Sequence, residues 1–162
     1  MERNRTSDVL ELVASLVVCL MAGAVGSIFT TPSIPTWYAS LQKPFFNPPG
    51  ELFAPVWTLL YLLMGLAAFF VWREGLSSRR VRVALALFLG QLALNILWSG
   101  AFFGMRSTLF GLIVIIPLWL AILVTMVLFF RVRGLSGWLM LPYLLWVTFA
   151  SVLNIALWQL NL

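Results

Sequence analysis

Five long apolar segments constrain the fold of this 162-residue chain more than any other feature. They run from Val9 to Phe29, Leu52 to Trp72, Val83 to Met105, Ser107 to Phe130 and Gly134 to Leu162, and Glu11 is the one charged residue within them. Each exceeds the roughly 20 residues that a helix needs to cross a bilayer. Hydrocarbon offers no partner to backbone polar groups, so only helices or closed barrels can span it, and these runs lack the alternation of barrel strands. The sequence therefore predicts an all-α membrane protein.

The composition agrees with this prediction. Charged residues make up 9% of the chain, against roughly 25% in soluble domains, and the mean hydropathy is +1.03. We expect a single five-helix transmembrane domain over residues 1–162, with a Pro/Trp-rich loop between the first two helices. The helices are expected at about 8–30, 51–73, 80–104, 107–131 and 135–160.

Basic residues collect on one side of the predicted bundle. That side carries eight of them: Arg3, Arg5, Arg73, Arg79, Arg80, Arg82, Arg131 and Arg133. The other side carries Lys43 and Arg106. Because cytoplasmic connections are enriched in Lys and Arg, we expect an integral multi-pass protein of the cell membrane, with its N-terminus in the cytoplasm and its C-terminus outside. The net charge of +5 suits contact with anionic membrane lipid, and the basic residues form no clustered platform for nucleic acid.

The residue inventory excludes several kinds of chemistry. The chain has no histidine, which removes imidazole as a general base, a haem ligand or a metal ligand. None of the five carboxylates lies at mid-membrane depth, where a proton or ion relay would need one. No nucleotide-binding motif occurs. What remains suits a large, flat, apolar ligand: 8 Trp, 3 Tyr, 13 Phe and a few amides.

Aromatic pairs on the helices have two interpretations. Trp57 and Tyr61 lie one turn apart on the same face of the second predicted helix. They fit the wall of a ligand site and an interfacial aromatic belt equally well, and the belt also suits Trp37 and Tyr38.

Polar and small residues within the third and fifth helices also have two interpretations. An amide at Asn95 must find a partner in hydrocarbon, either on another helix or on a ligand. Trp146, Ala150, Leu153 and Asn154 share one face, where a large ring beside a small residue leaves a slot for a flat ligand or for another helix.

Five motifs, taken in order, resemble the tryptophan-rich sensory protein and mitochondrial translocator protein family (TspO/MBR). They are WYASLQKPFFNPP, PVWTLLY, GQLALNILWS, FFGMR and PYLLWVTFASVLN, and they cover nearly the whole chain. The resemblance implies a five-helix bundle, often a homodimer, with a pocket closed by the loop between the first two helices. Family members bind porphyrins such as protoporphyrin IX, and many bind cholesterol and synthetic ligands.

The resemblance implies a membrane receptor or carrier that binds porphyrins and related apolar molecules, in transport or in tetrapyrrole-linked stress signalling. A light-dependent porphyrin-degrading enzyme, in which Trp57 and Trp146 act beside the bound ring, is the alternative. No cofactor is required in the first case, and the porphyrin is a ligand. The absence of histidine favours free-base porphyrin over imidazole-ligated haem. Nothing basic follows Arg133, so the fifth helix lacks the Tyr-to-Lys/Arg spacing proposed for cholesterol.

The ligand-binding residues that the resemblance implies come from all five helices and the first loop. They are Ser27, Trp37, Tyr38, Lys43, Ala54, Val56, Trp57, Tyr61, Asn95, Phe110, Ile113, Trp146, Ala150, Leu153 and Asn154; no metal ligand is among them. The prolines of the loop disfavour a regular helix. We expect an extended or turned segment with Trp37 and Tyr38 at the interface and Lys43 available to an anionic ligand edge.

The predicted orientation can be measured directly. A reporter that works only in the cytoplasm, fused after Leu162, should be inactive, because five spans carry the C-terminus to the outer side. The same reporter fused in the second connection should be active and serves as the control. Activity of the C-terminal fusion would overturn the orientation.

Overall fold

The computed structural model describes residues 5–162 and contains, within that range, helices and short connections without a strand. The long helices are α1 (Arg5–Ser33), α2 (Phe53–Trp72), α3 (Arg79–Ser99), α4 (Thr108–Val132) and α5 (Gly134–Leu160). Three short helices extend them: the π-helices η1 (Ile34–Tyr38) and η3 (Gly100–Gly104) and the 3-10 helix η2 (Gly50–Leu52). The expected all-α class with five spanning helices is confirmed. Arg3, counted above among the basic residues, lies outside the described residues.

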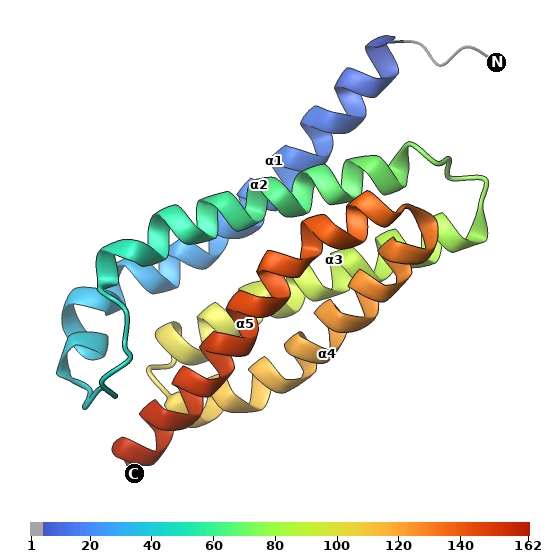
Figure 1. Ribbon diagram of the computed structural model, residues 1–162. Helices are drawn as coiled ribbons and strands as arrows, with labels where there is room; N and C mark the ends of the chain where they lie inside the picture. The colour runs from blue at the N-terminus through green and yellow to red at the C-terminus, as the bar shows by residue number, and fades with distance from the viewer. Residues whose placement is uncertain (1–4) are drawn as a thin grey trace.

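The five helices form a closed ring around the core (Figure 1). Helix α1 packs against α2 and α3, α2 packs against α5, and α4 packs against both α3 and α5. The order around the ring is therefore α1, α2, α5, α4, α3. Successive helices run in alternating directions, so the connection between α1 and α2 lies at the same end of the bundle as the C-terminus of α5, as Figure 1 shows.

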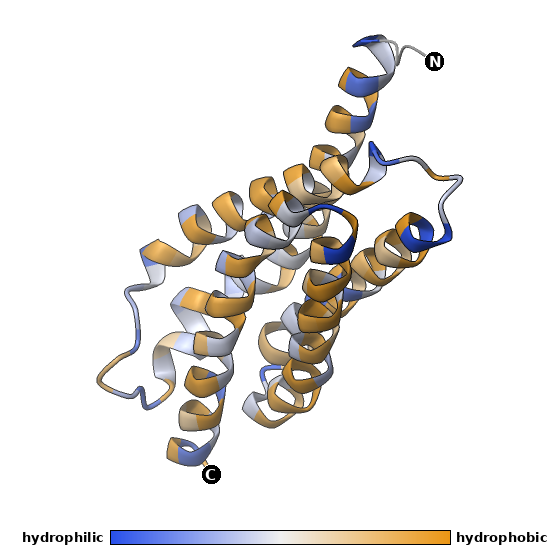
Figure 2. Ribbon diagram, turned by 45° about the vertical axis from the view of Figure 1, so that its right-hand side comes forward, coloured by the Kyte–Doolittle hydropathy of each residue, from blue (hydrophilic) through white to orange (hydrophobic). Residues whose placement is uncertain are grey.

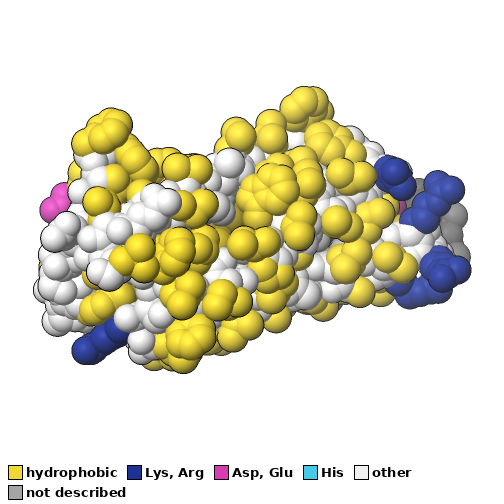
Figure 3. Space-filling view, turned by 90° about the horizontal axis from the view of Figure 1, so that it is seen from below, with side chains coloured by type: hydrophobic (Ala, Val, Ile, Leu, Met, Phe, Trp, Pro, Cys, Tyr) yellow, Lys and Arg dark blue, Asp and Glu magenta, His cyan; other side chains and the backbone are white. Residues whose placement is uncertain are grey.

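The surface of the bundle is apolar along most of its length. Hydrophobic residues dominate the helices, and hydrophilic ones gather at the ends and connections (Figure 2). The space-filling view shows the same surface between a cluster of basic side chains at one end and a few charged groups at the other (Figure 3). Large side chains such as Ile28, Ile116 and Leu145 are more than half exposed. An outer face of this kind requires lipid around it, so the chain is an integral multi-pass membrane protein.

Two ion pairs join helices at the basic end. Asp8 of α1 lies 3.0 Å from Arg73, which follows α2. Glu74, in the same connection, lies 3.0 Å from Arg133 at the junction of α4 and α5. Both pairs are partly exposed, so each stabilises the fold by at most about 1 kcal/mol. Their effect is to fasten the basic end of α1 and α5 to that of α2.

The first helical segment is longer than predicted and carries Tyr38 into the interior of the bundle. The prediction ended it near residue 30, whereas the chain stays helical through Tyr38 despite Pro32 and Pro35. Proline lacks the N–H that a regular helical turn uses, and a π-helical turn over 34–38 accommodates the change in hydrogen-bond partners. Tyr38 is consequently 4% exposed and packs inside the bundle.

The crossing of α1 and α2 depends on Gly65. A Cβ at this position would lie 3.0 Å from Leu16 Cα and 3.2 Å from the Ser15 carbonyl oxygen, both backbone atoms of α1. We expect Gly65→Ala to push the helices apart and lower the free energy of unfolding by about 1–3 kcal/mol. The matched control is Gly90→Ala on α3, where nothing lies within 4 Å of the added methyl group. Thermal unfolding in detergent should separate the two variants, and equal melting temperatures would contradict this view of the crossing.

Candidate functional site

The larger of two neighbouring cavities lies between α1 and α2 and has a volume of about 340 Å³. Its lining from α1 includes Gly23, Ser27 and Thr30, that from α2 includes Ala54, Trp57 and Tyr61, and that from α3 includes Trp98 and Ser99. Several lining residues, Ala24 and Thr58 among them, are exposed, so the cavity opens on the outer face of the bundle. Its size is at the lower end of the range for small-molecule pockets, roughly 300–1,000 Å³.

The smaller cavity lies deeper in the bundle, toward α5, and has a volume of about 20 Å³, the space of about one water molecule. Tyr38 of η1 borders it, together with Trp146, Ala150, Leu153, Asn154 and Leu157 of α5. The predicted slot beside Trp146 is therefore present and almost filled by side chains.

One layer of aromatic side chains separates the two cavities. Phe53, Trp57, Trp98 and Phe103 line both. The ring of Trp57 is stacked on that of Tyr61, with centroids 5.6 Å apart, and Phe53 meets Trp146 edge to face at 6.3 Å. No further layer of side chains lies between the two cavities. We call these four residues, Phe53, Trp57, Trp98 and Phe103, the aromatic wall.

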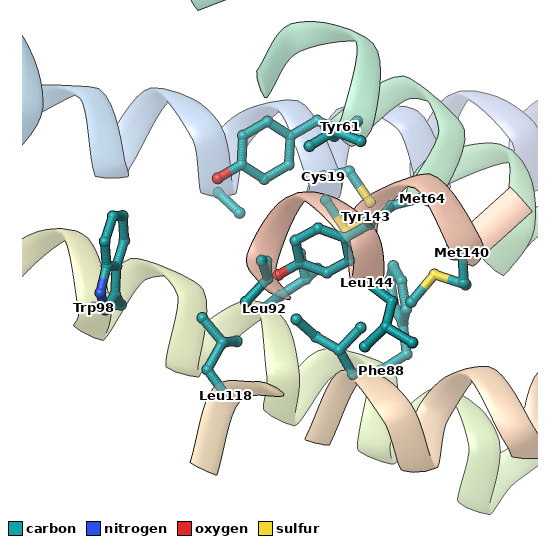
Figure 4. Close-up of a cluster of buried hydrophobic side chains, with 14 of the residues drawn as sticks. Cys19, Tyr61, Met64, Phe88, Leu92, Trp98, Leu118, Met140, Tyr143 and Leu144 are labelled. Atoms are coloured by element: carbon teal, nitrogen blue, oxygen red, sulfur yellow. The ribbon is translucent and has the colours of Figure 1, made fainter. Parts of the chain in front are cut away.

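A glycine on α1 makes room for Tyr61. A Cβ on Gly23 would lie 2.6 Å from the Tyr61 ring, closer than real side-chain contacts allow. The Tyr61 ring therefore lies directly against the α1 backbone and forms the inner side of the larger cavity. Figure 4 shows Tyr61 directed into the bundle toward α3 and α5.

The hydroxyl of Tyr61 starts a buried chain of hydrogen bonds across the bundle. It donates to Asn95 Oδ1 at 2.6 Å, and Asn95 Nδ2 donates to the Tyr143 hydroxyl oxygen at 2.8 Å. Asn95 is 1% exposed and lines neither cavity. Of its two interpretations, the interhelical one describes this structure, and Asn95 acts on the cavity only by holding Tyr61.

The amide of Asn154 is also used within the protein. Its Nδ2 donates to the Thr108 carbonyl at 2.8 Å, and its Oδ1 accepts from Trp98 Nε1 at 3.4 Å. By contrast, the indole N–H groups of Trp57 and Trp146 and the Ser99 hydroxyl form no hydrogen bond with any residue in the described range 5–162. A bound ligand can use these three groups without breaking a hydrogen bond between described residues.

Nine of the fifteen predicted site residues line the cavities. Ser27, Ala54, Trp57 and Tyr61 line the larger one, and Tyr38, Trp57, Trp146, Ala150, Leu153 and Asn154 line the smaller one. The remaining six, Trp37, Lys43, Val56, Asn95, Phe110 and Ile113, line neither.

Phe110, Ile113 and Lys43 lie away from the lining of both cavities. Phe110 and Ile113 are 46% and 55% exposed on the outer face of α4, so the structure does not bring them to the cavities. Lys43 Nζ donates to the carbonyls of Ala39 and Leu41 and lies 5.2 Å from the centre of the Tyr38 ring. It therefore caps a helix end from an exposed position, and its availability to an anionic ligand stays a prediction.

The two remaining side chains support the bundle. Trp37 meets Phe102 edge to face at 5.4 Å, and Val56 packs against the hydrophobic core.

Sequence reasoning did not single out the other lining residues as site residues, among them Gly23, Thr30, Phe53, Trp98, Ser99 and Phe103. Phe53 and Trp98 share helical faces with Trp57 and Asn95, so the 3.6-residue period could have identified them. Gly23 has the spacing of a helix-packing residue, and its place beside the cavity follows only from the position of Tyr61.

Comparison with known proteins covers nearly the whole chain. Residues 15–159 match the TspO/MBR family. A tryptophan-rich protein TspO of Archaeoglobus fulgidus is 46% identical over 155 residues, 95% of this chain and 99% of that protein. The human translocator protein is 39% identical over 138 residues, 85% and 82% of the two chains. A tryptophan-rich sensory protein of Cereibacter sphaeroides is 42% identical over 125 residues, 77% of each. The order of motifs, the five-helix ring and these similarities agree: the chain belongs to the TspO/MBR family.

Proposed function

We propose that this protein is a membrane receptor or carrier that binds porphyrins, such as protoporphyrin IX, and related apolar ligands at the aromatic wall. The observation that carries the proposal is the larger cavity, which has aromatic side chains on its inner side and no charged residue in its described lining. A flat conjugated ring buries a large apolar area against such rings and stacks on them favourably. Names given to relatives, translocator protein and tryptophan-rich sensory protein, suit transport or tetrapyrrole-linked signalling.

The polar parts of a porphyrin set its orientation in this proposal. Its carboxylates cannot enter the uncharged lining without a large desolvation cost. They would therefore stay at the end of the bundle where Thr31 and Gly50 border the cavity. The ring would extend inward against Trp57, past the free Ser99 hydroxyl. Rotation of Trp57 or Phe53 would join the two cavities and enlarge the site, because both residues line both spaces.

The cellular setting belongs to the same proposal. We place the N-terminal, basic end of the bundle in the cytoplasm and the connection between α1 and α2 on the outer side of a cell membrane, on the strength of the arginine distribution. A homodimer remains a prediction from the family resemblance.

Filling the larger cavity tests the ligand site. Titration with protoporphyrin IX should quench the tryptophan fluorescence of the wild-type protein in a saturable way. We expect Ala54→Phe to weaken binding at least about tenfold, because the added ring occupies the space of the ligand. Trp57→Phe combined with Trp146→Phe should also weaken it, through lost stacking and lost N–H donors.

The matched control is Ala93→Phe on α3, which adds the same ring at an exposed position that lines neither cavity. It should bind like the wild type. Wild-type affinity in Ala54→Phe and in the double tryptophan variant would show that porphyrin binds elsewhere or not at all.

The alternative function, light-dependent porphyrin degradation, rests on the same two tryptophans. Trp57 borders both cavities and Trp146 borders the smaller one, and their free indole N–H groups leave both rings unconstrained by hydrogen bonds. Under irradiation of the complex, an enzyme would give a defined product in fixed proportion to the porphyrin consumed, and the double Trp→Phe variant would not. Bleaching at the rate of free porphyrin in all samples would exclude this alternative.

A further inference from the structure

Most of the hydroxyl groups that line the larger cavity are used by their own helices. Ser27, Thr30 and Thr58 each donate to a carbonyl three or four residues earlier, at 2.7, 3.1 and 2.8 Å. A serine or threonine within a helix commonly bonds back to its own backbone in this way. The proton of each of these hydroxyl groups is therefore occupied, whereas its oxygen can still accept a hydrogen bond from a ligand.

Ser99, the last residue of α3, is an exception to this pattern. It lines the larger cavity and is only 7% exposed, and its hydroxyl forms no hydrogen bond with any residue from 5 to 162. A buried hydroxyl group usually has a partner, because leaving water without one is costly. The proton of Ser99 is therefore available to a molecule in the cavity.

A glycine of α1 leaves space beside this hydroxyl. A Cβ on Gly26 would lie 3.1 Å from Ser99 Oγ and 3.6 Å from Ser99 Cβ. Both residues line the larger cavity, so a side chain at position 26 would fill space next to the hydroxyl. Gly26 precedes Thr31, which borders the cavity near the end of the bundle, by five residues or about 7.5 Å along the helix. The Ser99 hydroxyl thus lies within the cavity and away from its polar end.

The larger cavity has few other donors for a ligand in its described lining. Tyr61 and Trp98 already donate to amide oxygens within the bundle. Thr31 is exposed, so water competes for its hydroxyl. The half-buried Trp57 carries one further free N–H, in the aromatic wall. Acceptors are more plentiful than donors here, and Ser99 supplies the free proton that is held on a buried hydroxyl.

We propose that Ser99 is a specificity-determining residue of the larger cavity, which selects flat apolar ligands with a carbonyl oxygen over ligands of the same shape without one. A carbonyl that leaves water needs a new donor, and the Ser99 hydroxyl supplies it while the ring stacks on Trp57. A hydrocarbon ligand leaves the hydroxyl unpaired. The inference rests on the proposed function, which makes this cavity a ligand site, and adds the chemical group that the site recognises.

The experiment compares two neutral three-ring molecules, 9-fluorenone and fluorene, which differ in the carbonyl oxygen. Binding of each radiolabelled molecule is measured by saturation with the full chain in lipid nanodiscs, after subtraction of empty nanodiscs. The wild type should bind fluorenone about five- to tenfold more tightly than fluorene, as expected for one hydrogen bond. The infrared carbonyl stretch of bound fluorenone should lie at lower frequency than that of fluorenone in empty nanodiscs.

Three variants assign the preference to a residue. Ser99→Ala removes the donor, so the ratio of the two affinities should fall to about one and the carbonyl stretch should return to its frequency in lipid. Gly26→Ala keeps the donor but places a methyl group beside it, and should also reduce the ratio. The matched control is Ser151→Ala on α5, which removes a hydroxyl that donates to the Val147 carbonyl and lines neither cavity. Its ratio and its infrared spectrum should equal those of the wild type.

Several results would overturn the role of Ser99. These are equal binding of the two molecules by the wild type, binding of neither, or a preference that survives in Ser99→Ala. A preference lost in Trp57→Phe but kept in Ser99→Ala would assign the recognition to the indole N–H instead.

The protoporphyrin IX titration described above decides the proposed function separately. Saturable porphyrin binding without a preference for fluorenone would retain the proposed function and remove this inference. A preference for fluorenone that depends on Ser99, without porphyrin binding, would do the reverse.

Discussion

Inside a bilayer no water is available to a polar atom, and the arrangement of this bundle depends on that constraint. Backbone groups are paired within the helices, and the buried amides of Asn95 and Asn154 find partners between them. Asn95 joins α3 to Tyr61 of α2 and to Tyr143 of α5, and Asn154 joins α5 to Trp98 and to the start of α4. These two residues link four of the five helices by hydrogen bonds that hydrocarbon makes costly to break. The shape of the cavities follows from them, because Tyr61 and Trp98 are cavity side chains held by an amide.

Helix α1 is bound to the ring in a different way. Its contacts with α2 depend on close approach at Gly65 and Gly23, and at the basic end on the ion pair between Asp8 and Arg73. The larger cavity lies along this less polar seam, where Ser27, Thr30 and Thr58 direct their hydroxyls back to their own helices. Amides therefore cross-link α2, α3, α4 and α5, whereas α1 is held mainly by packing, with one buried hydrogen bond from the Ser33 hydroxyl to the Phe103 carbonyl.

The sequence predicted the helices well and the site in part, for reasons that particular residues make clear. Apolar length is a local property, so all five spans could be recognised. The face shared by Trp57 and Tyr61 follows from helical period, and the structure confirms that their rings stack. Burial of Tyr38 could not be predicted, because it depends on a π-helical turn that lets the chain continue past two prolines. Lys43 carries a positive charge that suits an anion, but the nearest acceptors turn out to be carbonyls of its own chain. The hydrogen bonds between Gln42 and Asn161 span 119 positions and leave no pattern in the sequence.

The thinness of the aromatic wall has a consequence for occupancy. Trp57 and Phe53 are surfaces of both cavities, so a ring that shifts toward one cavity without rotating adds volume to the other. The two cavities therefore share one volume, which the positions of these rings divide between them. A shift of the aromatic wall would fit molecules of different thickness without separating the helices. Two molecules on opposite sides of the wall would compete for the same volume.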